Sequence, residues 1–328
     1  MNINLAIIGA GLIGRKRASA LPKEMKLSLI CDVDKKRGLQ FANDFNCSYE
    51  SNWEKVIANP HIHAVIICTT NSWLSKIGLA AIKASKHILV EKPGATSVSE
   101  LKTILSTHKK QPTVVLYGYN HRYHQAIIKA KELICSKKFG EILFIRARYG
   151  HGGRLGYEKE WRFQKDISGG GELIDQGSHL IDLTNYFCGE MTGVVGFTPT
   201  LFWKTKLEDT AFFVLKNKKN QYAHLSASCV EWKNIFSFEI MLRTAKVQID
   251  GLGGSYGMEK LILYTMKPEM GPPETQEFAF PDKDLSWEQE NKIFFDKIIK
   301  KDYSTDSIKN ALYIMKIIEK IYKQNKII

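Results

Sequence analysis

Short apolar runs alternate with helix-length segments through the first 120 residues of the chain. The runs are rich in Ile, Val and Leu, as buried parallel strands are, and they lie at residues 3–8, 26–31, 64–69, 87–90 and 113–118. The segments between them predict helices, among them 12–20, 35–45, 73–85 and 97–109. This regular alternation predicts an α/β domain in which a doubly wound parallel sheet carries helices on both faces.

After residue 121 the pattern changes to closely spaced strands. A helix at 126–137, a strand at 141–149 and a glycine-rich loop at 150–171 precede a helix at 172–187. Strands are then predicted at 194–203, 210–215, 222–230, 235–242, 246–249 and 261–265, followed by amphipathic helices at 286–300 and 304–322. Short turns between the strands predict an α+β domain with a large, mostly antiparallel open sheet. We therefore expect two domains, residues 1–120 and 121–328, with the C-terminal helices able to pack back on the first.

Composition and charge indicate which kinds of molecule the protein is expected to bind. The 328 residues are 44% hydrophobic and 25% charged, a globular balance, and the net charge of +13 favours anionic partners. The basic residues are dispersed and no zinc-finger spacing occurs, so nucleic-acid binding is not expected. There is no CxxC pair among the six cysteines, and no apolar stretch near the start approaches the roughly 20 residues of a membrane span. We expect a cytoplasmic protein with no metal site and no membrane contact.

A glycine-rich turn between the first predicted strand and helix is the first candidate site. In this GxGxxG motif Gly9 permits a tight turn, Gly11 lets the backbone approach a pyrophosphate, and Gly14 allows close packing of helix and strand. The amides that open the helix, at Leu12 and Ile13, would meet the phosphates. The motif in this place predicts dinucleotide binding.

Asp32 ends the second predicted strand, eighteen residues after Gly14. An acid at this place accepts hydrogen bonds from the adenosine ribose diol and repels a 2′-phosphate, so NAD is favoured over NADP. Lys35, Lys36 and Arg37 follow directly. One of them turning back toward a phosphate stays an alternative, although an exposed helix start is the interpretation we favour.

Lys92 stands directly after Glu91, where the predicted strand 87–90 ends. Ligands of open α/β sheets bind outside the carboxyl ends of the strands, so Lys92 is expected to face the cofactor and substrate. A surface charge is the alternative, because lysines at strand ends are common.

Polar residues recur along one side of the predicted helix 172–187. At about 100° per residue, Asp175, His179, Asp182 and Tyr186 fall within one sector of it. An ordinary amphipathic helix with a solvated face is the alternative. Metal binding is not expected, because the spacing differs from that of a zinc helix such as HExxH.

Taken together, these residues resemble the glucose-fructose oxidoreductase/inositol dehydrogenase (Gfo/Idh/MocA) family. The shared features, in chain order, are GAGLIG at 9–14, Asp32, KHILVEKP at 86–93, GYNHR at 118–122, and Asp175 followed four residues later by His179. The resemblance spans essentially the whole chain. It implies a Rossmann domain followed by a largely antiparallel sheet whose open face lines the substrate cleft.

The resemblance also implies roles for individual residues. Lys92, Asp175 and His179 would form the catalytic set, and Arg122 would lie near the substrate. The implied cofactor-binding set adds Thr69, Thr70, Asn71, Glu91, Lys92 and Asn120. The sequence departs from the family pattern TPNxxH, since Thr70 replaces the proline and Leu74 the histidine. This departure weakens the assignment of the 69–71 loop and leaves the catalytic set untouched.

Proton affinities suggest how the catalytic set would divide its roles. At ordinary pKa values of about 6.5 and 10.4, an imidazole is mostly neutral at pH 7 and an ammonium is charged. His179 is therefore the expected general base, and Lys92 is expected to stabilise the developing alkoxide. Asp175 would hold the substrate hydroxyl or favour the imidazolium. Burial of Lys92 would reverse the division.

Aromatic and basic residues gather in the segment 149–162. Arg154, Tyr157, Trp161 and Arg162 are the candidate substrate-binding residues, because rings stack on sugar faces and guanidinium groups bind phosphate or carboxylate. They favour a sugar with an anionic group, such as a nucleotide-linked sugar, and the segment is similar to family members of bacterial surface-polysaccharide synthesis. A structural loop held by salt bridges is the alternative.

We therefore expect an NAD-dependent oxidoreductase that transfers a hydride between a secondary alcohol of a sugar or nucleotide-linked sugar and nicotinamide. An inositol or free-polyol dehydrogenase is the alternative within the enzyme class. A non-catalytic dinucleotide sensor is the alternative outside it, which the presence of all three catalytic residues disfavours. The resemblance further implies a homodimer or homotetramer formed through the outer face of the antiparallel sheet.

Overall fold

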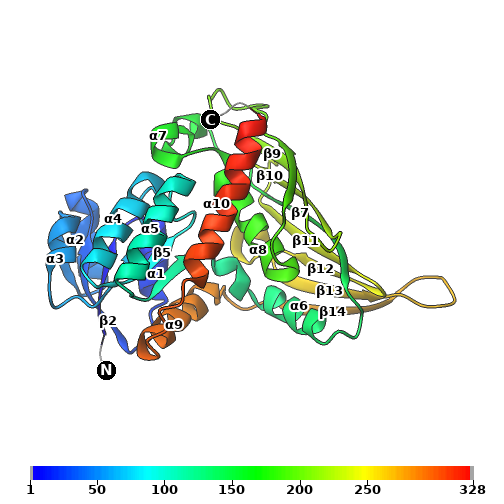
Figure 1. Cartoon of the computed structure of the whole chain (residues 1–328), viewed down its shortest axis with the longest axis horizontal. Helices are drawn as coiled ribbons and strands as arrows, with labels where there is room; N and C mark the ends of the chain where they lie inside the picture. Colours follow the sequence, from blue (N-terminus) through cyan, green and yellow to red (C-terminus); the bar gives the residue numbers. More distant parts are fainter. Residues whose placement is uncertain (1–2, 326–328) are drawn as a thin grey trace. The chain divides into compact units, whose positions relative to one another are not determined.

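The computed structural model describes residues 3–325 and divides the chain into two compact units (Figure 1). The first unit runs to Tyr119 and also contains Asp166–Gly169 and Trp287–Tyr313. The second unit consists of Asn120–Lys165, Gly170–Ser286 and the residues from Ile314 onward. None of the helices within residues 3–325 is long and apolar enough to span a membrane.

The first unit is built on a parallel sheet of six strands in the order β3-β2-β1-β4-β5-β6. The strands are β1 (Ile3–Ile8), β2 (Met25–Cys31), β3 (Ser48–Glu50), β4 (Ala64–Ile67), β5 (His87–Glu91) and β6 (Val115–Gly118). They are connected by helices α1 (Leu12–Ser19), α2 (Lys35–Asp44), α3 (Trp53–Ala58), α4 (Asn71–Lys83) and α5 (Val98–Lys110). The strand order changes direction between β1 and β4, as in a doubly wound nucleotide-binding sheet, and confirms the predicted fold class.

Three neighbouring strands of this sheet end side by side. Gly9 N donates to Cys31 O and Cys68 N donates to Ile8 O, each at 2.8 Å, and these bonds align the ends of β1, β2 and β4. The residues that follow these strands therefore gather at one edge of the sheet. In doubly wound sheets this edge is where ligands bind.

Two segments from later in the sequence complete the first unit. Asn71 donates through Nδ2 to the carbonyl of Ser168 at 2.8 Å. From α9 (Ser286–Ile299), Phe294 is fully buried against the core of the parallel sheet. Residues 166–169 and 287–313 thus belong to the first unit.

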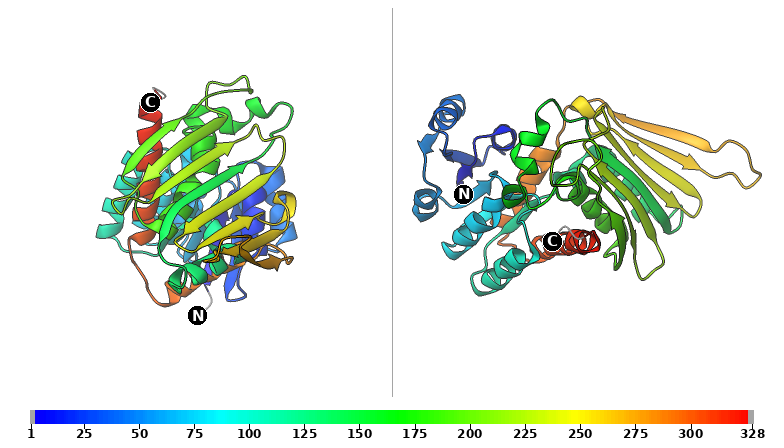
Figure 2. Two further views of the ribbon diagram at one scale, coloured as in Figure 1. Left: turned by 90° about the vertical axis from the view of Figure 1, so that its right-hand side faces the viewer. Right: turned by 90° about the horizontal axis from the view of Figure 1, so that it is seen from above.

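The second unit is built on a mixed sheet of eight strands in the order β14-β13-β12-β11-β7-β10-β9-β8. The strands are β7 (Ile142–Gly150), β8 (Gly193–Phe197), β9 (Thr210–Lys216), β10 (Tyr222–Ser228), β11 (Ile235–Leu242), β12 (Ala245–Asp250), β13 (Glu259–Thr265) and β14 (Glu274–Phe280). β10 runs parallel to β7 and the other neighbours are antiparallel, which confirms the mostly antiparallel sheet. Helices α6 (Gln125–Cys135) and α8 (Ser178–Cys188) cover one face, and no helix among residues 3–325 covers the opposite face (Figure 2).

The pattern does not predict β3, α3 or β14. β3 is a three-residue edge strand, and α3 has only six residues. β14 is an edge strand too, and most of its side chains are exposed. Each therefore buries too few apolar side chains to leave a periodic signal.

The predicted strand 194–203 is wrong beyond Phe197. The carboxylate of Asp209 accepts hydrogen bonds from the backbone amides of Leu201, Phe202 and Trp203, at 2.8–3.0 Å. These amides converge on one side chain, so they are not available to a neighbouring strand. A buried carboxylate has overridden the β propensity of the aromatic residues.

Candidate active-site residues in the two units

The glycine turn after β1 forms a cradle in which two of the three glycines have no room for a side chain. Gly9 has φ +108°, and a Cβ there would lie 2.4 Å from Cys68 O. A Cβ at Gly14 would lie 2.0 Å from Gly9 O, whereas one at Gly11 would meet no atom within 4 Å. The turn is therefore tightly packed on the protein side, at Gly9 and Gly14, and open at Gly11, which suits the binding of a pyrophosphate against the backbone. Leu12, which begins α1, is 73% exposed at the same place.

Asp32, directly after β2, accepts four hydrogen bonds within the first unit. Its Oδ2 accepts from Ala10 N (2.7 Å) and Arg37 Nε (3.0 Å). Its Oδ1 accepts from Asp34 N (2.9 Å) and Arg37 Nη2 (2.6 Å). Burial opposes the charged form of this carboxyl, but these bonds outweigh burial and lower its pKa below the ordinary value. Arg37 stands at the exposed helix start that we favoured, and its guanidinium pairs with Asp32 there.

The predicted cofactor loop at 69–71 follows β4. Asn71 is buried, and its amide holds Ser168 as described above. Thr69 and Thr70 are partly exposed, and Thr70 is the residue before α4. Leu74, in the place of the usual histidine, is fully buried in α4, so this departure from the family pattern fills a core position.

Glu91 is tied to the glycine motif. Its Oε1 accepts from Arg17 Nε on α1 at 2.6 Å, and Arg17 also donates through Nη2 to Glu290 Oε2 at 2.6 Å. Arg17 is completely buried, and burial opposes its charge, yet the two carboxylates raise its pKa. Asn291 completes the group by donating to the carbonyls of Arg17 and Ala20 at 3.0 Å. Glu91 thus fixes the backbone directly before Lys92, whose bond to Pro93 is cis.

In the second unit, Asp175 and His179 lie on an irregular helical segment. Residues Leu173–Gly177 form a turn of π-helix, and α8 begins at Ser178. The 100° wheel of a regular helix is therefore wrong for this segment. The predicted polar face is solvated only in part: His179 is 4% exposed and Asp182 is completely buried, whereas Asp175 and Tyr186 are partly exposed.

Aromatic rings surround His179. Its ring stacks on that of His121, with centroids 3.7 Å apart, and Tyr149 meets it edge-on at 6.0 Å. Tyr149 is in turn hydrogen-bonded to Tyr256, and burial together with this neighbour raises the pKa of Tyr149 well above its ordinary value. The imidazole thus contacts rings from η1 (Asn120–Tyr123) and β7, and Tyr256 of the 251–257 turn packs in turn against Tyr149. Sequence reasoning missed these rings.

Asp175 forms an ion pair with an arginine. Arg162 Nε donates to Asp175 Oδ2 at 3.1 Å, and Arg162 Nη1 lies 3.3 Å from Glu160 Oε2. Arg154 Nη2 also pairs with Glu160, at 2.5 Å. The guanidinium of Arg162 lies 4.8 Å from the ring centroid of Trp161. The structure therefore joins three of the four predicted substrate residues to Asp175 in one network of ion pairs and ring contacts.

Two predicted site residues make structural contacts in the second unit. Arg122 Nε and Nη2 donate to the two oxygens of Asp182, at 2.8 and 2.6 Å. Asn120 donates through Nδ2 to Ser286 Oγ at 2.8 Å. Nε and Nη2 of Arg122 and Nδ2 of Asn120 therefore already have protein partners.

The fourth residue of the predicted substrate loop, Tyr157, belongs to a small buried core. Its ring packs against Phe163 and Trp203 at centroid distances of 5.3 and 5.8 Å. Its hydroxyl lies 3.2 Å from Nε2 of His151. Burial would lower the pKa of His151, but its contact with Glu172 raises it. Tyr157 therefore stabilises the loop by packing in this buried core.

Glu208 anchors the start of the helical segment that carries Asp175 and His179, and the sequence contains no sign of this role. Its Oε1 accepts from Gly171 N (3.0 Å), Leu173 N (3.2 Å) and Tyr322 Oη (2.6 Å). Tyr322 comes from α10 (Asp306–Gln324). Burial raises the pKa of Glu208 to about 7 although these bonds oppose the rise. A Cβ at Gly171 would lie 1.9 Å from Glu208 O, and one at Gly170 would lie 2.0 Å from Tyr322 Oη, so these two glycines allow the close approach of Glu208 and Tyr322.

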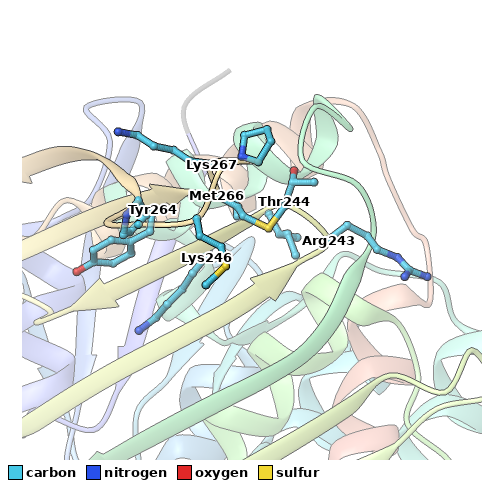
Figure 3. Close-up of a pocket in the computed structure, with 12 residues that line it drawn as sticks. Arg243, Thr244, Lys246, Tyr264, Met266 and Lys267 are labelled. Carbon is cyan, nitrogen blue, oxygen red and sulfur yellow. The ribbon is translucent and has the colours of Figure 1, made fainter.

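A surface hollow of about 760 Å³ lies elsewhere in the second unit (Figure 3). It is lined by residues of the β11–β12 turn and the β13–β14 connection, including Arg243 and Lys246. Leu242 beside it pairs with Ile142 at the start of β7, whereas Tyr149 lies near the end of that strand. None of the predicted site residues lines the hollow.

Comparison with known families accounts for both units. The family of oxidoreductases with an NAD-binding Rossmann fold matches residues 3–119, and the Gfo/Idh/MocA C-terminal domain matches residues 127–248. The chain is a member of the Gfo/Idh/MocA family. This finding confirms the resemblance inferred from GAGLIG, KHILVEKP and the paired Asp175 and His179.

Curated Gfo/Idh/MocA relatives match part of the chain. Levoglucosan dehydrogenase of Pseudarthrobacter phenanthrenivorans is 32% identical over 209 residues, which are 59% of this chain and 53% of that protein. Glucose-6-phosphate 3-dehydrogenase of Bacillus subtilis is 30% identical over 186 residues, 56% of this chain and 53% of that protein. The chain thus matches about half the length of these relatives.

Solved structures of the family share the fold of the chain. A levoglucosan dehydrogenase structure in complex with NADH has a TM-score of 0.90 at 22% sequence identity, covering 98% of this chain and 96% of that one. GenD2 from gentamicin A biosynthesis in complex with NAD has a TM-score of 0.84 at 19% identity, covering 98% and 93%. At these identities the likeness establishes the fold.

Proposed function

We propose that this protein is a cytoplasmic NAD(P)-dependent dehydrogenase that transfers a hydride between a secondary alcohol of a sugar and nicotinamide, with NAD preferred. One observation carries the proposal. A carboxylate and an imidazole, Asp175 and His179, lie one turn apart on a helical segment, the first paired with Arg162 and the second stacked on His121. The glycine cradle and Asp32 supply the matching nucleotide site in the first unit.

The proposed mechanism assigns one role to each catalytic residue. His179 accepts the proton of the sugar hydroxyl as general base. Asp175 orients that hydroxyl and favours the charged imidazolium, while Arg162 holds its carboxylate in place. The ammonium of Lys92 stabilises the developing negative charge on the oxygen. A bound nicotinamide supplies the acceptor for the hydride.

The proposed substrate is a sugar or a nucleotide-linked sugar, as in surface-polysaccharide synthesis. A second candidate, a neutral free sugar or a polyol such as inositol, is favoured by the ion pairs of the substrate loop. Arg154 and Arg162 are both engaged by Glu160, and Arg162 also by Asp175, so the charge that would bind an anionic substituent is already balanced. The relatives named above act on levoglucosan and on glucose 6-phosphate, one neutral and one anionic sugar.

A substrate panel tests the proposal. The protein is incubated with NAD⁺ and with neutral sugars, sugar phosphates, nucleotide-linked sugars and inositol, and the absorbance of reduced nicotinamide is followed. We expect turnover with at least one of them and its loss in Lys92→Ala with nucleotide binding intact. Bound NAD⁺ without turnover on any member of the panel would instead favour a dinucleotide sensor.

We further propose that two or four copies associate through the bare face of the second sheet. Val195, Phe197, Phe212 and Val214 lie on β8 and β9 with 40–67% of each residue exposed, and they alternate with buried neighbours on β9. A second copy of the chain would cover this apolar stripe. Light scattering should report a dimer or tetramer that Phe212→Glu dissociates; a monomeric wild type would contradict the proposal.

A further inference from the structure

We propose that Tyr256 is a substrate-specificity residue whose phenol hydroxyl donates a hydrogen bond to a neutral hydroxyl group of the sugar. The inference rests on the proposed function and deepens it, because it names a group that recognises the substrate of the same site. Tyr256 is not among the residues predicted from the sequence. It ends η5 (Gly254–Tyr256), in the turn between β12 and β13.

Tyr256 is joined through neighbouring side chains to both candidate residues of the second unit. Its hydroxyl is hydrogen-bonded to the side chain of Gln176, which directly follows Asp175 in the π-turn. It is also hydrogen-bonded to Tyr149, the ring that meets His179 edge-on, and the two phenol rings have centroids 5.4 Å apart. The phenol group of Tyr256 is therefore one side chain away from Asp175 and from His179, where a bound sugar would lie.

The directions of these hydrogen bonds leave the proton of Tyr256 to a ligand. Burial raises the pKa of Tyr256 to about 12, whereas the bonds from Tyr149 and Gln176 lower it, as bonds to its oxygen do. The same bond raises the pKa of Tyr149, as expected of the donor. A hydroxyl accepts two bonds and donates one. The oxygen of Tyr256 accepts twice, and no acceptor for its proton occurs among residues 3–325.

The charges around Tyr256 favour a neutral hydroxyl over an anionic group. Two carboxylates, those of Glu172 and Asp175, act on its phenol, and both raise its pKa. Asp175 already pairs with Arg162, and Glu172 lies 3.5 Å from Nε2 of His151. An anionic substituent placed here would meet carboxylates whose cationic partners are engaged, whereas a sugar hydroxyl would meet an uncharged donor.

The turn that carries Tyr256 also fixes the position of its ring. A Cβ at Gly251 would lie 2.4 Å from Met258 O, so the two strands approach closely at the base of the turn. At its tip Gly257 has φ +85°, and Gly253 N donates to Gly257 O at 2.9 Å. The backbone is thus closed around Tyr256, and little freedom is lost when its hydroxyl binds a sugar.

Kinetics with monodeoxy sugars test this inference. The best sugar of the panel and its monodeoxy analogues are compared on the full chain as wild type, Tyr256→Phe and the matched control Tyr303→Phe, an exposed tyrosine of the first unit. We expect Tyr256→Phe to raise the KM of the parent sugar about three- to tenfold, the loss of one neutral hydrogen bond. Its kcat and its Kd for NAD⁺ should stay within about twofold of wild type. Tyr303→Phe should change none of these values.

One monodeoxy analogue should identify the sugar hydroxyl that Tyr256 contacts. Removing that hydroxyl should raise the KM of the wild type but not that of Tyr256→Phe, because the variant has already lost the bond. The other analogues should lose equally in both proteins. A KM of Tyr256→Phe within about twofold of wild type for the parent sugar would overturn the inference. So would an equal loss of every analogue in both proteins, because Tyr256 would then act only through Tyr149 and Gln176.

Failure of the proposed reaction gives a different result. If no sugar turns over, the Kd of each sugar of the panel is measured calorimetrically on protein saturated with NADH. Sugar binding that Tyr256→Phe weakens about three- to tenfold and Tyr303→Phe does not would support the inference and refute the proposed reaction. Equal sugar binding in all three proteins would overturn the inference, and no binding of any sugar would overturn both.

Discussion

The two units fix their candidate residues by different physical means. In the first unit the backbone forms the site: glycines without room for a side chain and strands that end together leave amides at one edge of the sheet. In the second unit side chains hold the candidate residues: Arg162 pairs with Asp175, and the buried rings of His121 and Tyr149 pack against His179. Substitutions that add a side chain should therefore disrupt the first site by steric crowding. Substitutions that remove an ion-pair or hydrogen-bond partner should disrupt the second.

The largest effect is expected from the second unit, in Arg122→Met. This change leaves the carboxylate of Asp182 completely buried without its ion-pair partner. Breaking a buried pair costs about 3–5 kcal/mol, and we expect that loss of unfolding free energy in urea titrations. The double variant Arg122→Met/Asp182→Leu should recover part of it, since no charge is stranded. A loss below about 1 kcal/mol in the single variant would show that the pair is dispensable.

The first unit is tested by a matched pair of glycine substitutions. In Gly14→Ala the new Cβ falls 2.0 Å from a carbonyl oxygen, so we expect about 3 kcal/mol of destabilisation. In Gly11→Ala the Cβ meets no protein atom within 4 Å, so stability should hold while nucleotide affinity falls. Thermal unfolding and NAD⁺ titration of both variants check this. Equal stability of the two variants would refute the crowded-cradle account.

Glu208→Gln tests whether the raised pKa of this buried carboxyl makes the stability of the protein depend on pH. The pKa of Glu208 is raised from 4.5 to about 7 in the folded state, so folded protein keeps a proton that the unfolded chain releases between those values. Stability therefore falls as pH rises from about 4.5 to 7, by up to about 3 kcal/mol from this group. Glutamine accepts the same three bonds through Oε1 without titrating. In urea titrations, the difference in unfolding free energy between the variant and the wild type should shift in favour of the variant from pH 5 to pH 8. An equal change of both proteins with pH would contradict this.

The smallest effect is expected at the rim of the substrate loop. Arg154 is 76% exposed and pairs only with Glu160 among the ion pairs of the described residues, so Arg154→Ala should cost less than about 1 kcal/mol of stability. If the substrate is neutral, the KM of that substrate should stay within about threefold of the wild-type value. A large rise in KM confined to phosphorylated or nucleotide-linked sugars would show that Arg154 exchanges Glu160 for the substrate.

The sequence predicts the first unit better than the second because the motifs of the first are local in sequence, whereas the contacts of the second join residues that are far apart in it. Gly9, Gly11, Gly14 and the strand ends are local features, each readable within a few residues. Even there the ion pair between Arg37 and Asp32 was not predicted, because a pairing across five residues leaves no periodic pattern.

The second unit depends on contacts that no local pattern records. Glu208 and Tyr322 lie far from Gly171 in sequence and join it only in the fold. The π-turn before α8 also changes which residues share a face, so a regular helical wheel could not place Asp175 and His179. Gly170 and Gly171 were visible in the sequence only as part of a glycine-rich loop, and the structure shows that each allows a close approach, to Tyr322 and to Glu208.

The central claim is that His179 transfers the substrate proton, and His179→Gln measures this most directly. With the best substrate from the panel, we predict that kcat falls about 100-fold or more, that the rise of kcat with pH attributable to a base disappears, and that the Kd of NAD⁺ stays within about twofold. An unchanged kcat and pH profile in a folded variant that binds NAD⁺ normally would contradict the account.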